Sequence, residues 1–93
     1  MSERVIRIPE RFDFGYHKEF TEHQNKILAD ANVTEITLEF SHVAYLDSSA
    51  LGMMVLLHKK ARNQNISVRI RGPKESIKEI LQIANFDQIF DIS

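Results

Sequence analysis

The sequence has no cysteine, only three glycines and almost no net charge. Because a chain without cysteine has neither a disulfide framework nor a thiolate nucleophile, its composition fits a reducing compartment, and we expect it in the cytoplasm. Twelve basic and thirteen acidic side chains give a formal charge of −1. Neither sign is in the excess that would favour nucleic acid or a membrane surface as a partner.

Glycine-rich phosphate loops and long apolar runs are also missing. The three glycines stand too far apart for a G-x-G-x-x-G or G-x-x-x-x-G-K loop, so we expect no bound nucleotide and no other cofactor. The longest apolar run, residues 51–57, is far shorter than the roughly 20 residues that span a bilayer, and the first residues lack a signal-peptide core. With 93 residues the chain has room for one core. We therefore expect one soluble domain over residues 1–93.

Period-two alternation predicts the strands. Between residues 35 and 40, Ile36, Leu38 and Phe40 alternate with polar residues, which is typical of a strand that buries one face. The closing segment 89–92 fits either a short strand or an extra helical turn. The other predicted strands are residues 5–8 and 66–70.

Apolar residues at helical spacing predict three helices. The apolar spacing of the first covers about residues 16–29, and either Asp13 or Gly15 just before it can begin the helix. The second covers residues 48–63, which are apolar on nearly every side for two turns and then basic, as a partly buried helix with cations near its C-terminus would be.

The third helix is predicted to start with Pro73 at its first helical position. Asn85 is placed to end it in a left-handed conformation. Its buried face is expected to carry Ile77, Ile80, Leu81 and Ala84.

Strands and helices alternate along the chain, so the predicted fold class is α/β, with a small mixed or parallel sheet of about four strands. Arg69 and Arg71 fall on the polar side of one strand, where they can lie across from Glu35 and Glu39 of another. Such polar strand faces indicate helices packed mainly on one face of the sheet. The opposite face would be open, and something else can dock there.

The segment Asp47-Ser48-Ser49-Ala50-Leu51-Gly52 stands where a strand gives way to the second helix. Its simplest interpretation is a helix cap, in which the side chain of Asp47 or Ser48 accepts a hydrogen bond from an unpaired backbone N–H. A functional interpretation adds that Ser48 is an exposed hydroxyl at the positive end of a helix, where an attached phosphate is tolerated.

Other chemistry has weaker support. The sequence around Ser48 has no G-x-S-x-G motif of a serine hydrolase. A catalytic triad of Ser48 with one of the four histidines, His17, His23, His42 or His58, is therefore a minor alternative. Glu19 and His23 lie one helical turn apart, but two ligands without H-E-x-x-H or cysteine fit an exposed intrahelical pair better than a metal site. We expect neither a catalytic residue nor a metal ligand.

The segment around Ser48 resembles the STAS domain of bacterial anti-sigma factor antagonists, in which D-S-S-G-L-G follows a strand and opens a helix. Arg11-Phe12-Asp13 resembles the acidic turn G-x-[LF]-D of that family, and residues 80–92 resemble its closing helix and strand. The resemblance covers nearly the whole chain and implies a STAS-like single domain.

The family resemblance also implies a function, that of a partner-switching regulator. The unphosphorylated protein would bind an anti-sigma factor or related serine kinase, phosphorylation of Ser48 would release it, and a PP2C-type phosphatase would reset the cycle. Asp13 and Asp47 would shape the kinase contact. The remaining partner-binding positions implied by the resemblance are Ser49, Ala50, Leu51, Met53 and Met54.

The chain departs from the family pattern in three places. Ala50 replaces the usual glycine, Pro9-Glu10 replaces a glycine-containing approach, and the family's extra N-terminal strand and final helix are missing, which makes this a minimal form. Ala50 leaves partner choice open, and the choice between Ser48 and Ser49 requires peptide mapping. The alternative function is a constitutive adaptor docked on a transporter ATPase or another signalling enzyme, with Ser48 acting only as a cap.

Overall fold

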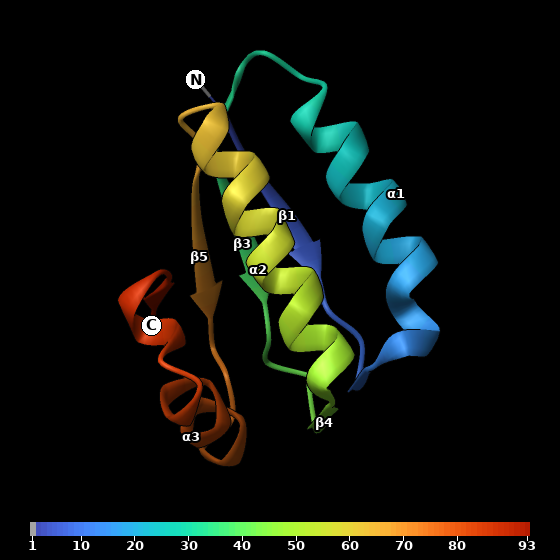
Figure 1. Cartoon of the computed structure of the whole chain (residues 1–93), viewed down its shortest axis with the longest axis vertical. Coiled ribbons are helices and arrows are strands. Elements are labelled where there is room, and N and C mark those ends of the chain that lie inside the picture. Colours follow the sequence, from blue (N-terminus) through green and yellow to red (C-terminus); the bar gives the residue numbers. More distant parts are fainter. Residues whose placement is uncertain (1) are drawn as a thin grey trace.

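The computed structural model describes residues 2–93. The chain folds into a sheet with helices on one side (Figure 1). Here η denotes a short 3-10 helix. The elements are β1 (Ser2–Arg7), β2 (Arg11–Phe12), η1 (Phe14–Tyr16), α1 (His17–Leu28), β3 (Val33–Glu39), β4 (Tyr45–Leu46), α2 (Ser48–Asn63), β5 (Ser67–Arg71), α3 (Glu75–Ile83), η2 (Phe86–Gln88) and β6 (Asp91–Ile92).

The main sheet confirms the predicted α/β class. Its four strands run in the order β1-β3-β5-β6, and every neighbouring pair is parallel. The helices α1 and α2 lie side by side in front of the sheet in Figure 1, and α3 lies beyond the carboxyl end of β5. Because neighbouring strands are parallel, each connection between them includes a helical segment and returns the chain to the end of the sheet where the strands begin.

The core lies between the sheet and its helices. Ile36 and Leu38 of β3 and Phe40 directly after it, the predicted buried face of this strand, have no exposed surface. From the helix side, Phe20 of α1 and Leu57 of α2 are also buried. Removing such apolar side chains from water supplies about 25 cal/mol per Å² of buried area, so the packing of the helices on the sheet is a main source of stability.

The opposite face of the sheet is open and carries paired charges, as the sequence predicts. Arg71 donates from Nε to Glu39 at 2.8 Å, and Arg69 reaches Glu35 at 4.0 Å. Thr37 is fully buried, and its hydroxyl hydrogen-bonds to the carboxylate of Glu3 on the neighbouring strand. The pairs Arg71–Glu39 and Thr37–Glu3 are hydrogen-bonded across strands, and Arg69 donates to Asp91 of β6, on a face that none of the described helices covers.

The third helix differs from its prediction. Pro73 does not occupy the first helical position, because Lys74 is the N-cap and α3 begins at Glu75. Ile80 is 39% exposed rather than buried. Asn85 does adopt the predicted left-handed conformation, with φ of 62°.

Of the two alternatives predicted for residues 89–92, the short strand is present. The helical turn η2 comes first, and the two-residue strand β6 then pairs with β5. Among residues 2–93, no helix has the length and apolar character needed to cross a bilayer.

The charge pair between Glu39 and Arg71 makes stability depend on pH. The hydrogen bond from Arg71, assisted by the Ser41 N–H, lowers the pKa of Glu39. A carboxyl group whose pKa is lower in the folded state stabilises the fold above its ordinary pKa, about 4.3, and loses that contribution as pH falls through the folded value. We predict that Glu39→Gln lowers the free energy of unfolding near neutral pH by up to about 1 kcal/mol and reduces the further loss at lower pH.

Thermal unfolding near neutral pH and below the pKa of Glu39, followed by circular dichroism, measures this effect. Glu79→Gln, on the exposed side of α3, is the matched control and should behave as the unaltered protein. Equal acid sensitivity of Glu39→Gln and the unaltered protein would contradict the assigned role.

Candidate functional site

Two strands, β2 and β4, are too short for a period-two pattern to reveal, and they bring Asp13 and Asp47 to the same end of a small ladder. Arg11 pairs with Tyr45 and Phe12 with Leu46 in a parallel ladder separate from the main sheet. The Asp47 N–H donates to the Phe12 carbonyl at 3.3 Å. The turn that follows β2 and the start of α2 are therefore held together, although Phe14 and Asp47 are 33 residues apart in sequence.

Asp47 is the N-cap of α2. Its Oδ1 accepts a hydrogen bond from the Ala50 N–H at 2.9 Å, and its Oδ2 lies 3.4 Å from the Phe14 N–H. One carboxylate thus satisfies a free donor of α2 and also contacts the turn that leads into α1. The cap interpretation of the segment is confirmed, with Asp47 rather than Ser48 as the acceptor.

Asp13 has the corresponding place in front of η1. Its Oδ1 accepts from the Gly15 N–H at 2.9 Å, and Arg11 lies 3.4 Å from its Oδ2. The Arg11 guanidinium also stacks over the ring of Tyr45, 4.4 Å from its centroid. Asp13 is the N-cap of η1, and α1 itself starts at His17, so neither Asp13 nor Gly15 begins that helix as predicted.

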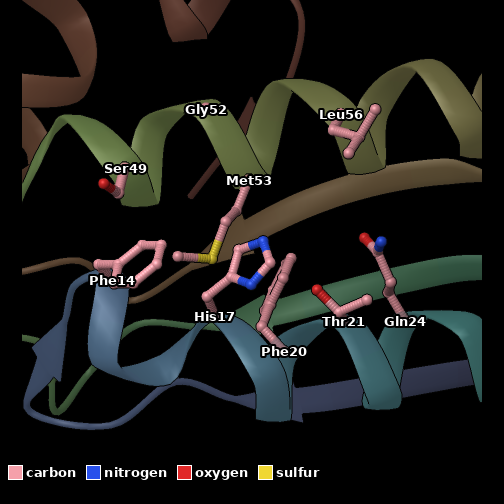
Figure 2. Close-up of a pocket in the computed structure, with 9 residues that line it drawn as sticks. All are labelled: Phe14, His17, Phe20, Thr21, Gln24, Ser49, Gly52, Met53 and Leu56. Atoms are coloured by element: carbon pink, nitrogen blue, oxygen red, sulfur yellow. The ribbon is translucent and has the colours of Figure 1, made fainter.

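The two serines face different surroundings. Ser48 is the first residue of α2 and is exposed, so its hydroxyl is accessible beside the capping carboxylate of Asp47. Ser49 is half-buried and faces α1 (Figure 2). Backbone N–H groups at the beginning of a helix point outward and favour an anion, so a phosphate on Ser48 would meet a favourable backbone field.

Some residues expected to bind a partner belong to the core. Ala50 and Met54 have no exposed surface, and a side chain without exposed surface cannot contact a partner docked on this face. The expected contact role of these two residues is therefore corrected. Leu51 is partly buried against the core, and Met53, 6% exposed, reaches the surface only at a groove.

That groove, named here the α1–α2 groove, runs between the two helices beside Ser49 and has a volume of about 260 Å³. Figure 2 shows the side chains of His17, Phe20 and Met53 in the space between the two helices. The α1 side contributes Phe14, His17, Phe20, Thr21 and Gln24, and the α2 side contributes Ser49, Gly52, Met53 and Leu56.

Sequence reasoning missed the exposed apolar residues of this groove. Phe14 is 69% exposed and stacks on His17, with ring centroids 5.6 Å apart, and Leu56 is 48% exposed. A large apolar residue directly after Asp13, inside a polar turn, is the only signal of Phe14 in the sequence. Phe14, Leu56 and Met53 together make the surface next to Ser49 apolar.

The weaker chemical alternatives gain no support from the geometry. In the described part of the chain, no histidine hydrogen-bonds to the Ser48 hydroxyl, and His58 instead packs edge-on against Phe90. No group of three acidic or histidine side chains that could hold a metal ion occurs between residues 2 and 93.

Comparison of the sequence with known proteins identifies the domain. The family profile of the STAS domain matches residues 2–93. A STAS-domain containing protein of Pseudomonas aeruginosa (strain UCBPP-PA14) is 35% identical over 91 residues, which cover 98% of this chain and 88% of that protein.

Solved structures share the fold at lower identity. A Thermotoga maritima protein described as a candidate anti-sigma factor antagonist has a TM-score of 0.81 and 23% identity, over 95% of this chain and 77% of its own. Two structures of the Bacillus anti-sigma factor antagonist SpoIIAA match 96% of this chain at 16% identity. The unphosphorylated form has a TM-score of 0.74 over 76% of its own chain, and the phosphorylated form has a TM-score of 0.73 over 80% of its own chain. A sulfate transporter family protein from Wolinella succinogenes has a TM-score of 0.81 at 13% identity. The match covers 92% of this chain and 69% of that protein's chain.

The similarity to these solved structures is one of fold, and they include antagonists of anti-sigma factors as well as a transporter family protein. The match of the family profile over residues 2–93 and the 35% identical relative extend over almost all of the sequence. The chain therefore belongs to the STAS domain family.

Proposed function

We propose that this STAS domain is a partner-switching regulator controlled by phosphorylation of Ser48. The observation that carries the proposal is the exposed Ser48 hydroxyl at the first position of α2, directly after the capping Asp47. In its unphosphorylated form the domain binds an anti-sigma factor or related serine kinase, and the phosphorylated form releases it. A PP2C-type phosphatase returns the protein to the binding form.

Electrostatics make one phosphate sufficient for the switch. Phosphorylation adds about −1.5 to −2 charge at a surface that already carries the carboxylate of Asp47. A phosphate left unpaired in an interface costs several kcal/mol, and a cost of about 3 kcal/mol weakens binding roughly a hundredfold. The fold needs no rearrangement, because the beginning of a helix accommodates an anion.

The binding surface in this proposal surrounds the start of α2. Ser48 and Asp47 form its polar part, and Ser49, Phe14 and Leu56 lead from there along the α1–α2 groove. SpoIIAA, which has the same fold, is an anti-sigma factor antagonist with a phosphorylated form, and this supports a related role here. The domain acts in the cytoplasm through binding, without catalysis, metal or cofactor.

Ser48 variants test the switch. We predict that Ser48→Ala abolishes phosphorylation and keeps partner binding, whereas Ser48→Asp weakens that binding because it adds a permanent negative charge. A true phosphoserine should weaken binding by about a hundredfold. Intact mass of the protein purified from its own cells, followed by peptide mapping, measures phosphorylation.

Ser49→Ala is the matched control, since it removes the neighbouring hydroxyl and leaves Ser48 in place. Phosphorylation that disappears in Ser49→Ala and persists in Ser48→Ala would assign the acceptor to Ser49. If protein from native cells under varied growth conditions never carries a phosphate, the proposed switch is wrong.

Asp47 variants separate its cap role from its charge. We predict that Asp47→Ala lowers the free energy of unfolding by about 1 kcal/mol, because the Ala50 N–H loses its acceptor, and that Asp47→Asn retains most of it. Chemical denaturation measures both values. If the charge of Asp47 also guides the kinase, Asp47→Asn will be phosphorylated more slowly at unchanged stability, and equal rates would restrict Asp47 to capping.

A second candidate function follows from the Wolinella succinogenes neighbour, which is a sulfate transporter family protein with the same fold. In this case the domain is a constitutive adaptor docked on a transporter ATPase or another signalling enzyme. The adaptor function predicts copurification with that enzyme at the same yield for the unaltered protein and for Ser48→Asp. A strong loss of copurification in Ser48→Asp would favour the phosphorylation switch instead.

A further inference from the structure

The main sheet ends in two outer strands of unequal length. β6 has two residues, whereas β1 has six and pairs only with β3 among the described residues. In the main sheet, the outer side of β1 therefore carries backbone N–H and C=O groups without a partner strand (Figure 1). A long edge of this kind is a template for a further strand unless proline, lysine or a bulge blocks it.

The ladder with β3 determines which residues of β1 face outward. The Ile8 N–H, directly after the strand, donates to the Glu39 carbonyl at 3.0 Å. Because alternate residues of a strand direct their backbone groups to opposite sides, Glu3, Val5 and Arg7 direct theirs away from β3. The strand contains neither proline nor lysine, and its one register irregularity lies at its first two residues. These three residues therefore form an unblocked edge.

The side chains of the same three residues lie on the open face of the sheet, since Ile6 between them is buried on the helix side. Val5 is 44% exposed, and it is the one large apolar side chain of the described main sheet that is exposed. Among the described residues, no ion pair involves Arg7. The edge thus carries an apolar residue at its centre and a cation without a counter-charge near one end.

The order of these side chains makes the edge complementary to a second copy of itself. If two β1 strands pair antiparallel with Val5 opposite Val5, then Glu3 of each copy lies opposite Arg7 of the other. Opposite charges directly across an antiparallel pair stabilise it. This register also sets each outward-facing residue opposite another one, so backbone hydrogen bonds form along the whole edge. A shift by two residues would put a charged residue opposite Val5 and lose both charge pairs.

The helix side of this edge leaves room for a second copy. A recess of about 400 Å³ lies beside β1, lined by Ile6 of the strand, by Tyr16 and by Glu19 and His23 of α1. The helix therefore does not close over the outer side of the strand.

We propose that the domain forms a two-fold symmetric dimer in which the β1 strands of two copies pair antiparallel, with Val5 at the axis and an ion pair between Glu3 and Arg7 on either side of it. The two sheets then join into one continuous sheet. Because the strands of the two copies run in opposite directions, the two Ser48 surfaces lie at opposite ends of it. Both stay open to partners, and the inference does not depend on the proposed function.

Sedimentation equilibrium over a range of protein concentrations measures the association. We expect the average mass to rise with concentration from that of one chain toward that of two. Pairing through a single edge makes a small interface, so the expected Kd lies between about 1 μM and 1 mM. A mass that stays at one chain up to about 1 mM would overturn the inference.

A lysine on the axis tests the edge. Val5→Lys sets two like charges opposite each other and should weaken dimerisation at least about tenfold. Ser67→Lys is the matched control, because it adds the same charge to an exposed position of the same sheet face on β5, away from the edge, and should leave dimerisation unchanged. If Val5→Lys has no effect, or if both variants weaken dimerisation equally, β1 is not the contact.

An exchange of charges tests the register. Glu3→Arg and Arg7→Glu each put like charges into both pairs, so either variant alone should dimerise at least about tenfold more weakly. In an equimolar mixture of the two variants, a mixed dimer again joins opposite charges in both pairs, and association should return to within about threefold of the unaltered protein. Each substitution affects its own chain in the same way in the mixture, so recovery reports the contact between chains. A mixture that associates no better than its components would reject the antiparallel pairing.

Discussion

One carboxylate connects the two halves of the surface around Ser48. Asp47 accepts from the Ala50 N–H at the start of α2 and lies near the Phe14 N–H of the turn before α1. The β2–β4 ladder holds the same two segments through the backbone. As a result Ser48, Ser49 and the mouth of the α1–α2 groove have fixed relative positions. One partner protein could therefore contact all three at the same time.

The fold could be predicted where local pattern and tertiary environment agree. The prediction for α2, residues 48–63, matches its observed bounds, because a capping aspartate precedes a long apolar segment and a basic last turn. The alternation in β3 likewise identified its buried face. In contrast, β2 and β4 have two residues each, which is too short for any period, and their pairing depends on the folded chain.

The candidate site could be predicted only in part, for the same reason. A helix that is apolar on nearly every side gives no sequence signal of which residues its neighbours cover. The packing of α2 on the sheet buries Ala50 and Met54, and the position of α1 leaves Leu56 at the surface. Phe14 and Gln24 join the site through the same contact between helices, which no spacing in the sequence reveals.

The rigid cap at the start of α2 also has a consequence for timing. Since a phosphate on Ser48 would meet helix N–H groups that are already in place, no slow internal rearrangement separates modification from its effect. Response times would then follow from encounter and dissociation rates alone. The output of a population of molecules would be graded, in proportion to the fraction carrying the phosphate, and any threshold would have to arise in the opposing enzymes.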